Sequence, residues 1–506
     1  MISDLNNKIL MSITGNSLIL KSTTKEQISE QTCSLVFEHI CSILDNNSEQ
    51  KILLSFQGDL KHYKIVKYIK NIPVKNFKVY SYDSHIGTDF STDEIACHKH
   101  KIDYVVKFII SKTSKFISIV IYDYKTRFYV KKDILKKVHE SFCSNQKLES
   151  VDNDLNYEAE LLNVDHLISV QASKEEILKA FFNVRPRYKS RSLVLVNNDY
   201  SLSLCSQLFS NYDTSFKVKK SKISNNKSRK FFDTFKNLLP KLKNYQSIIY
   251  IDNYSNLATD FLIDYKLKNL SLDQVVLLYL DFLVEELKRS NQVNIKKLFV
   301  VIPPNASSQI IELIKQYKMR YFYYNSDTIE ELLNDENCLF AYSFEKINAN
   351  PRYSKIHNNY YFLICLVWML NIYRNRNNLL SFKYNSLKEN LGSIHVIKKY
   401  KKIEFANLNN LVSIIENKYL ESKLFNKIVV FKSWCENNYA LLKLYSDNSK
   451  NSVSIYYDSE KENIVFEYHI FSEDSKQNVS WKFQYFKMAL WINKVIKSLK
   501  SYFKKD

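Results

Sequence analysis

Glycine is scarce in this chain of 506 residues. Only Gly15, Gly58, Gly87 and Gly392 occur, where roughly 7% of residues is usual. Loops that cradle phosphate with backbone amides need positive φ angles, which residues other than glycine adopt poorly. The sequence therefore argues against a glycine-rich nucleotide-binding loop of the P-loop or dinucleotide type.

Paired cysteines and long apolar runs are also missing. The eight cysteines are widely spread and form no CxxC pair, which is typical of reduced, buried thiols. The most apolar run, 361–370, is shorter than the roughly 20 residues that cross a bilayer, and the first residues lack a long apolar signal segment. We therefore expect a cytoplasmic protein with no transmembrane segment.

Acidic residues are fewer than basic ones, 53 against 73, which gives a net charge of +20. Such a balance can indicate a nucleic-acid or other polyanion partner. However, Lys, Asn, Ile and Tyr are abundant together, as expected for an AT-biased gene, and the basic residues are mostly scattered. The densest basic run, 217–230, is a candidate polyanion-binding segment, with a solvated surface loop as the default interpretation.

Strands and helices alternate along most of the chain, which predicts layered α/β domains with mixed sheets. The alternation restarts twice, and after about residue 407 the pattern changes to short strands followed by one long helix. We predict three similar α/β domains, 1–184, 185–290 and 291–406, and a smaller α+β domain with an antiparallel sheet, 407–506. Within the first domain we expect a loop at 13–17 and a helix at 174–182. Further helices are expected at 63–69, 231–242 and 411–419.

The stretch 247–287 is the most informative local pattern. Residues 248–251 form a β-branched apolar run that predicts a buried strand, and the run ends at Asp252 and Asn253. A second apolar piece, 261–263, follows a short polar turn, and Ser271 then caps an amphipathic helix. This layout often holds a metal or phosphate at a strand end, but the loop carries a single carboxylate.

The order and spacing of these units resemble the α-D-phosphohexomutase superfamily, which contains phosphoglucomutases and phosphomannomutases, over nearly the whole chain. The family's FGTxGxRG loop corresponds to 11–18, which keeps Thr14 and Gly15, and its VxxxxTPxxxF segment corresponds to 77–98, with Thr88 and Phe90 in comparable places. The resemblance implies four domains around a central cleft.

The family's phosphorylated serine lies in a TASHNP loop, which corresponds to 109–114. The resemblance makes Ser111 the candidate nucleophile. The His-Asn-Pro of the family motif is replaced here by Lys112, Thr113 and Ser114, and the alternative is that Ser111 is only a turn residue at a strand end.

The family's metal loop, DGDGDR, provides three aspartates for one Mg²⁺ and corresponds to 252–257. Only Asp252 is retained, whereas the other two aspartates are replaced by Tyr254 and Asn256, and the arginine by Leu257. Magnesium prefers near-octahedral oxygen ligands with carboxylate charge. The sequence therefore predicts that Asp252 is a remnant that is insufficient to hold the metal.

The other two family loops are changed as well. The sugar-binding GEESxG loop corresponds to 341–348, where Glu345 is the candidate contact for sugar hydroxyls. The phosphate-binding RPSGTEP loop corresponds to 443–450, where Lys443, Ser446 and Lys450 could bind an anion weakly. The alternative for this last segment is a solvated hairpin loop.

Because all four loops differ from the family pattern, we expect a pseudoenzyme without a cofactor that has a binding or scaffolding role and an unidentified protein partner. Two alternatives stay open. One is a divergent phosphosugar mutase that uses Ser111, Asp252 and Glu345 with Mg²⁺, and the other is a polyanion-binding or structural assembly protein.

Overall fold

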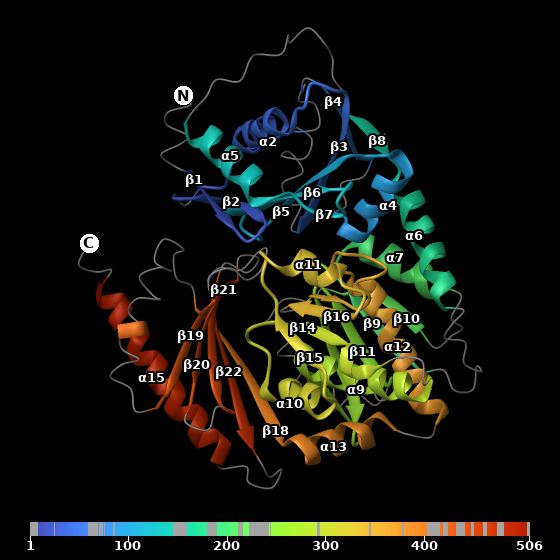
Figure 1. Ribbon diagram of the computed structural model, residues 1–506, viewed down its shortest axis with the longest axis vertical. Helices are drawn as coiled ribbons and strands as arrows, with labels where there is room; N and C mark the ends of the chain where they lie inside the picture. The colour runs from blue at the N-terminus through green and yellow to red at the C-terminus, as the bar shows by residue number, and fades with distance from the viewer. Residues whose placement is uncertain are drawn as a thin grey trace.

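The structure is a computed structural model that arranges the chain as an upper unit above three further units (Figure 1). It describes residues 9–24, 26–58, 69, 74, 76–83, 87–144, 159–179, 190–210, 216–221, 242, 244–290, 294–343, 346–376, 379–401, 415–417, 424–431, 441–446, 450–458, 463–472 and 480–502. Within these residues, the strands form four separate sheets.

The first sheet is mixed and has the strand order β1-β2-β6-β5-β3-β4-β8, with β7 paired to β6. Its strands are β1 Ile9–Thr14, β2 Ser17–Ser22, β3 Gln50–Gly58, β4 Phe77–Tyr82, β5 Tyr104–Ile110, β6 Phe116–Asp123, β7 Phe128–Tyr129 and β8 Glu160–Leu162. Its helices are α2 Glu30–Leu44, α4 Phe90–His100, α5 Lys132–Cys143 and α6 Val164–Lys179. Side chains of α2 and α5 belong to one core cluster of the sheet and those of α4 and α6 to the other. The sheet is thus covered on both faces, which explains its continuous apolar strands.

The second sheet has the order β10-β9-β11-β12-β13. Its strands are β9 Ser192–Val196, β10 Phe216–Lys220, β11 Ser247–Ile251, β12 Leu257–Ile263 and β13 Lys266–Leu270, with helices α7 Asp199–Ser210 and α9 Leu272–Ser290. Ser271 begins α9 as predicted: its Oγ accepts the Gln274 amide at 3.3 Å, and the Gln274 side chain accepts the Ser271 amide at 3.0 Å. This reciprocal pair is a capping box, which fixes where the helix starts.

The third sheet has the order β15-β14-β16-β17. Its elements are η7 Ile295–Lys297, β14 Phe299–Ile302, α10 Ser308–Gln316, β15 Arg320–Tyr323, α11 Ile329–Asn334, β16 Cys338–Ser343, β17 Lys346–Asn348, α12 Asn359–Asn375 and α13 Leu380–Leu391. Helix α12 is buried along nearly its whole length, which explains why its sequence is apolar on every side.

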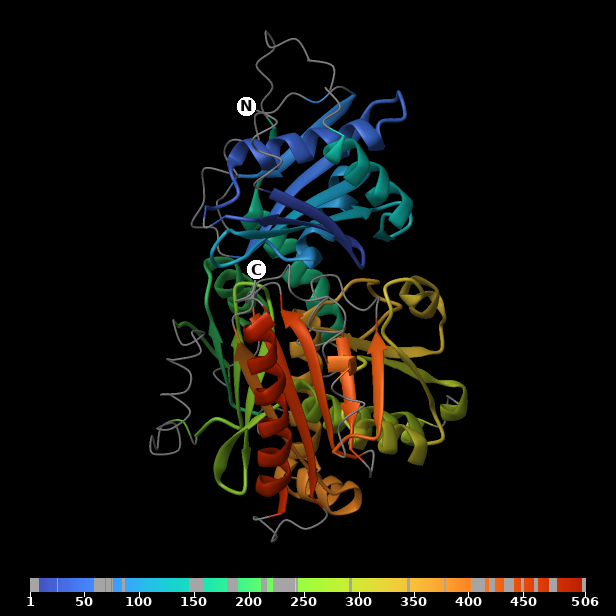
Figure 2. The same cartoon turned by 90° about the vertical axis from the view of Figure 1, so that its left-hand side faces the viewer.

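The fourth sheet is antiparallel, with the order β18-β22-β21-β20-β19. Its strands are β18 Ser393–Lys401, β19 Lys427–Phe431, β20 Leu441–Tyr445, β21 Ser452–Asp458 and β22 Asn463–Ser472, and helix α15 Ser480–Tyr502 packs along one face. Figure 2 shows α15 lying along the outside of this sheet.

The predicted fold class is confirmed: α/β units with mixed sheets are followed by an antiparallel unit with one long helix. Strand β18 was not predicted, and because it pairs with β22 the fourth sheet begins before residue 407. The domain boundaries themselves stay predictions.

Three local predictions differ from the structure or fall outside it. The loop predicted at 13–17 is the turn of a hairpin, because β1 and β2 pair from Ile9 to Ser22. The helix predicted at 174–182 begins earlier, as part of α6. The helices predicted at 63–69 and 231–242 lie almost entirely outside the described residues, and of the helix predicted at 411–419 only 415–417 are described, as helix.

The four units share packed interfaces. One apolar cluster includes side chains from the first, second and third sheets. The first unit also contacts the fourth, since Ile19 and Phe116 belong to the cluster under α15 and the Phe116 ring lies 6.1 Å from that of Tyr457. Within the described residues, no helix combines the length and apolar character needed to cross a membrane.

Candidate functional site

The candidate site lies where strand ends of the first unit meet the β11–β12 turn and the segment before α12. A small pocket there leaves about 20 Å³ for the centres of water-sized molecules, which is enough for about one water. Its lining residues come from three units: Gln57, Asp89, Phe90, Tyr129, Ser255, Lys346, Ile356, His357 and Asn359. Most of these lining residues are polar.

Ser111 follows directly after β5, as the sequence predicted, and lies in a tight turn before β6. Its amide donates to the Phe116 carbonyl at 3.0 Å, and its own carbonyl accepts the amide of Ser114 at 3.0 Å. Ser114 adopts a positive φ of 57°. Ser111 is only 2% exposed. In this arrangement Ser111 is buried within the turn.

Tyr254 connects the β11–β12 turn to the end of β5. Its hydroxyl donates to the Ile110 carbonyl at 3.0 Å, and its ring lies against Gly58 at the end of β3. A Cβ placed on Gly58 would come within 2.7 Å of the Tyr254 ring and 2.3 Å of the Ile110 carbonyl oxygen. Tyr254 thus fills the space between the turn and the residue before Ser111.

Asp252 is used by its own turn. One carboxylate oxygen accepts the amides of Tyr254 and Asn256 at 2.8 and 2.9 Å, and the other accepts the Asn256 side-chain amide at 3.1 Å. The Asp252 carbonyl also accepts the amide of Ser255, which has a positive φ of 60°. The carboxylate therefore holds the shape of the turn, as Asx turns commonly do.

This donor set does not fit Mg²⁺. A single carboxylate is present, its oxygens already accept amide hydrogens, and the residues in place of the second and third aspartates are a tyrosine that donates to a carbonyl and an asparagine that donates to Asp252. Within the described part of the chain, no group of three or more His, Cys, Asp or Glu side chains could hold a metal ion.

The third unit contributes His357, Lys346 and Asn359 to the pocket. Burial, and to a smaller extent the Lys346 ammonium, lowers the pKa of His357 to about 3. The ring is therefore neutral near pH 7. Its Nδ1 is buried and has no hydrogen-bond partner among the described residues, while its Nε2 lies 3.3 Å from the Ser343 hydroxyl. Glu345, the predicted sugar contact, lies outside the described residues.

Hydrogen bonds join the three units around the pocket. Gln57 donates to the Ser255 hydroxyl at 3.2 Å, and Asn359 donates to the Ser255 carbonyl at 2.7 Å. The Tyr360 hydroxyl lies 3.3 Å from that of Ser255 and 2.8 Å from that of Ser201 on α7. Ser255 is thus a junction where all three units meet.

Lys443 has a different position from the one predicted. Its ammonium is buried and donates to the carbonyls of Pro304 and Ala306 at 3.1 and 2.9 Å. Burial lowers its pKa to about 8, with Asp273 and Glu467 acting in the opposite direction. The ammonium attaches the fourth unit to the third, so it does not face the hairpin loop where an anion was expected.

Ser446 and Lys450 lie at that loop. The Ser446 amide and hydroxyl both donate to the Asn451 carbonyl, at 3.0 and 3.3 Å, and the Lys450 ammonium lies 4.2 Å from the centre of the Phe471 ring. Neither residue lines the central pocket. The anion-binding prediction at this loop now concerns these two residues alone.

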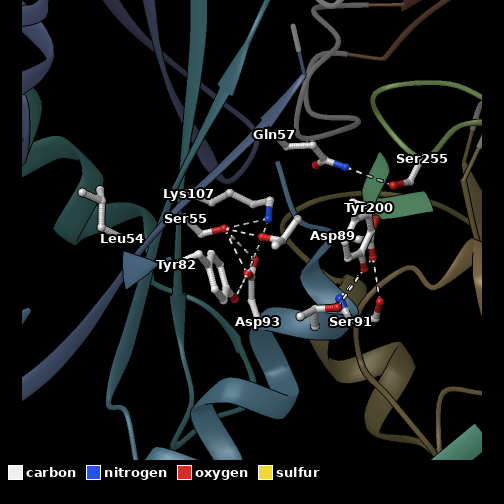
Figure 3. A network of polar contacts seen from close by, with 12 residues as sticks. Leu54, Ser55, Gln57, Tyr82, Asp89, Ser91, Asp93, Lys107, Tyr200 and Ser255 are labelled. Carbon is white, nitrogen blue, oxygen red and sulfur yellow. Dashed lines mark hydrogen bonds and ion pairs between the residues drawn. The ribbon is translucent and has the colours of Figure 1, made fainter. Parts of the chain in front are cut away.

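A buried ion pair was not predicted from the sequence. Lys107 on β5 contacts Asp93 on α4 at 2.5 Å, with the two side chains 0% and 1% exposed. The carboxylate also accepts from the hydroxyls of Ser55, Tyr82 and Thr88 at 2.5 to 3.1 Å (Figure 3). Burial, followed by the Asp93 charge, raises the pKa of Tyr82 well above its usual value. The signal in the sequence was the lone lysine among apolar residues at 104–110.

A second network joins the first unit to α7. Asp89 caps α4 by accepting the Ser91 amide at 3.1 Å, and the Ser91 hydroxyl accepts from Gln171 at 2.9 Å. Thr92 donates to Gln171 at 2.6 Å and lies 2.8 Å from the Tyr200 hydroxyl. These contacts hold the pocket residue Asp89 in place (Figure 3).

The basic run at 217–230 is described only in its first part. Lys217, Lys219 and Lys220 lie on β10 at the edge of the second sheet, and Lys220 pairs with Asp199 at 2.5 Å. Residues 222–230 lie outside the described residues.

Comparison with solved structures shows the fold. The chain is similar to parafusin, an exocytosis-sensitive phosphoprotein and phosphoglucomutase from Paramecium in its open form, with a TM-score of 0.61, 9% identity and coverage of 92% of this chain and 91% of that one. It is also similar to a phosphoglucomutase/phosphomannomutase family protein from Burkholderia thailandensis, with a TM-score of 0.59, 9% identity and coverage of 96% and 97%. No protein-family profile matches the sequence, and neither does any curated protein.

Proposed function

We propose that this chain, which has the phosphohexomutase fold, no longer transfers phosphoryl groups and instead has a binding or scaffolding role in the cytoplasm. The observation that carries the proposal is Tyr254. Its hydroxyl donates to the Ile110 carbonyl, and it stands where the resemblance expects the second metal-binding aspartate.

The chemistry of phosphoryl transfer supports this proposal. Charge spreads over the transferred group in the transition state, and a metal ion is its usual stabiliser. A neutral phenol supplies no such charge, and its ring fills the space beside Gly58. Asp252 supplies one carboxylate where the family pattern has three, and its oxygens accept three hydrogen bonds within the turn.

The surroundings of Ser111 point in the same direction. A serine nucleophile must reach its substrate, and Ser111 is 2% exposed in a closed turn. The residues that follow it, Lys112 to Ser114, form that turn and do not repeat the family motif. The fold is therefore retained, whereas two of the three metal-binding aspartates of the family pattern are replaced and Ser111 is buried.

Turnover assays test the proposal directly. Purified protein is incubated with glucose 1-phosphate or mannose 1-phosphate, Mg²⁺ and the corresponding bisphosphate activator, with an active phosphoglucomutase as the positive control. We expect no conversion and no phosphate on Ser111 in the mass of the intact protein. Magnesium-dependent conversion that disappears in Ser111→Ala would overturn the proposal.

The alternative is a divergent phosphosugar mutase in which Ser111, Asp252 and Glu345 act with Mg²⁺. The observation behind it is that Asp89 and Lys346 line one polar pocket. That pocket holds about one water, so it would have to widen to admit a phosphosugar. Phosphate on Ser111 would favour this alternative. Stabilisation by a phosphosugar without turnover would instead favour a binding protein, and Lys346→Ala is the variant that should remove such binding.

The partner is also a proposal. We propose one or more protein partners, captured in stoichiometric amount by tagged protein from its native cell. A polyanion partner for the run at 217–230 is the other candidate. It requires steeply salt-dependent binding to nucleic acid that weakens when the run is neutralised, and absence of binding at low salt would remove it.

A further inference from the structure

The outer face of α15 exposes large apolar side chains. Phe483 is 58% exposed, Phe486 56% and Leu490 46%. Their spacing of three and four residues places them on one face of the helix. Single exposed apolar residues are common on protein surfaces, but three aligned on one helix face form a continuous stripe.

The stripe does not result from poor packing of the helix. The opposite face carries Met488, Ile492, Val495 and Ile496, which are buried in the cluster that includes β20, β21 and β22. Helix α15 is therefore held firmly on the sheet, and the stripe points away from it. Figure 2 shows the helix on the outside of the molecule over its full length.

The same helix is strongly basic. It contains lysines and no Asp or Glu over residues 480–502. Lys482, Lys487, Lys494 and Lys497 are exposed, and the Lys487 ammonium lies 4.4 Å from the centre of the Phe483 ring. Positive charge thus flanks the apolar stripe along the helix.

From this combination we propose that α15 docks the protein on an anionic bilayer surface. In this arrangement the helix lies parallel to the membrane. Phe483, Phe486 and Leu490 enter the boundary between headgroups and acyl chains, and the lysines contact lipid phosphates. The proposal concerns a surface far from the central pocket and holds whether or not the pocket retains catalysis.

Shape and charge favour a bilayer over other occupants. A second copy of the chain would bring lysines against lysines, which repel one another. A partner helix binds in a groove, whereas this stripe lies on the convex outer side of a single helix. A bilayer surface is flat, negatively charged and apolar beneath its headgroups, so it complements both features.

The expected effects of substitutions follow from the electrostatic and the apolar contributions to membrane binding. A lysine near an anionic membrane strengthens binding by about five-fold, so the double substitution Lys482→Gln, Lys487→Gln should weaken it by roughly 30-fold. The apolar contribution grows with buried apolar area, so Phe483→Ser with Phe486→Ser should reduce binding by on the order of 100-fold. Both pairs are exposed, so neither should change the melting temperature by more than a few degrees.

Flotation of the full-length protein with vesicles tests the proposal. One set of vesicles is pure phosphatidylcholine, and the other contains about one third phosphatidylserine. Matched controls are Phe382→Ser, which removes an aromatic residue 70% exposed on α13, and Lys136→Gln with Lys137→Gln on the exposed side of α5.

We expect the protein to bind anionic vesicles and not vesicles of pure phosphatidylcholine. Salt and both α15 variants should weaken this binding, and the control variants should bind as the unmodified protein does. The proposal is wrong if anionic vesicles are not bound at low salt, or if the α15 variants bind as well as the controls. It is also wrong if the stripe captures an acidic helical peptide but no vesicles.

Discussion

Replacing Asp93 with asparagine should strongly destabilise the first unit. The substitution keeps the size of the side chain but removes the charge that faces Lys107, and both side chains are essentially inaccessible to solvent. A buried ammonium without its counter-charge costs about 3–5 kcal/mol. The Lys107 ammonium would keep the Ser55 hydroxyl at 2.9 Å as an acceptor, together with the side-chain carbonyl of the new asparagine.

The reverse substitution should cost less. In Lys107→Met the Asp93 carboxylate still accepts three hydroxyl hydrogens, from Ser55, Tyr82 and Thr88, and charge-assisted hydrogen bonds of this kind are strong. We therefore expect the loss of stability in Asp93→Asn to exceed that in Lys107→Met by about 1 kcal/mol or more. The asymmetry distinguishes this network from a simple ion pair.

Hydrogen exchange in the intact protein is the appropriate assay, because a chain of several domains does not unfold in one transition. Peptides that cover β5 should exchange on the order of 10² to several times 10³ faster in Asp93→Asn. Peptides from α15 should exchange as in the unmodified protein. A change in β5 below ten-fold, or a larger effect of Lys107→Met, would refute the reasoning.

Three further predictions concern other sites. Tyr254→Asp with Asn256→Asp restores two carboxylates. We expect Mg²⁺ at millimolar concentration to raise the melting temperature of this variant and not that of the unmodified protein. Equal shifts in melting temperature would contradict the role given to Tyr254. The pKa of Lys443 is lowered to about 8 in the folded state, so below pH 8 the buried ammonium destabilises the folded state by its full amount. This penalty decreases as the pH rises towards the pKa of the unfolded chain, near 10.5. Stability should then increase by about 3 kcal/mol over this window relative to Lys443→Met, and identical pH profiles would rule this out. Ser271→Ala removes the cap of α9 and should cost about 1 kcal/mol in urea unfolding, with Gln274→Ala costing less; no change in either variant would mean that packing alone sets the helix start.

Much of the fold was predictable from local patterns. The run at 248–251 and the cap at Ser271 specify β11 and the start of α9, because a buried strand and a capping box both depend on neighbouring residues. Strand β18 was missed for the opposite reason. Its second half is exposed and rich in lysine, and its extended form depends on pairing with β22, 63 to 79 positions later in the chain.

For the candidate site, the sequence predicted only which residues of the family motifs are replaced. The sequence shows that Tyr254 replaces a carboxylate, but not that its hydroxyl reaches Ile110, since the two residues are 144 positions apart. Likewise, Lys443 has the charge expected of a phosphate-binding residue, and only the position of 304–306 in the third unit shows that carbonyls occupy its ammonium. Contacts between units decide these roles, and no local pattern encodes them.

The glycine at position 58 shows where the AT bias of the gene is limited by the structure. Glycine codons are rich in G and C, so a drift towards A and T removes them wherever another residue can stand. At Gly58 none can, because φ is 104° and a Cβ would collide with the Ile110 carbonyl and the Tyr254 ring. A saturation library at this codon, selected for folded protein, should therefore return glycine alone. The contact of Gly58 with Ile110 and Tyr254 would then be a point in the chain that composition bias cannot change.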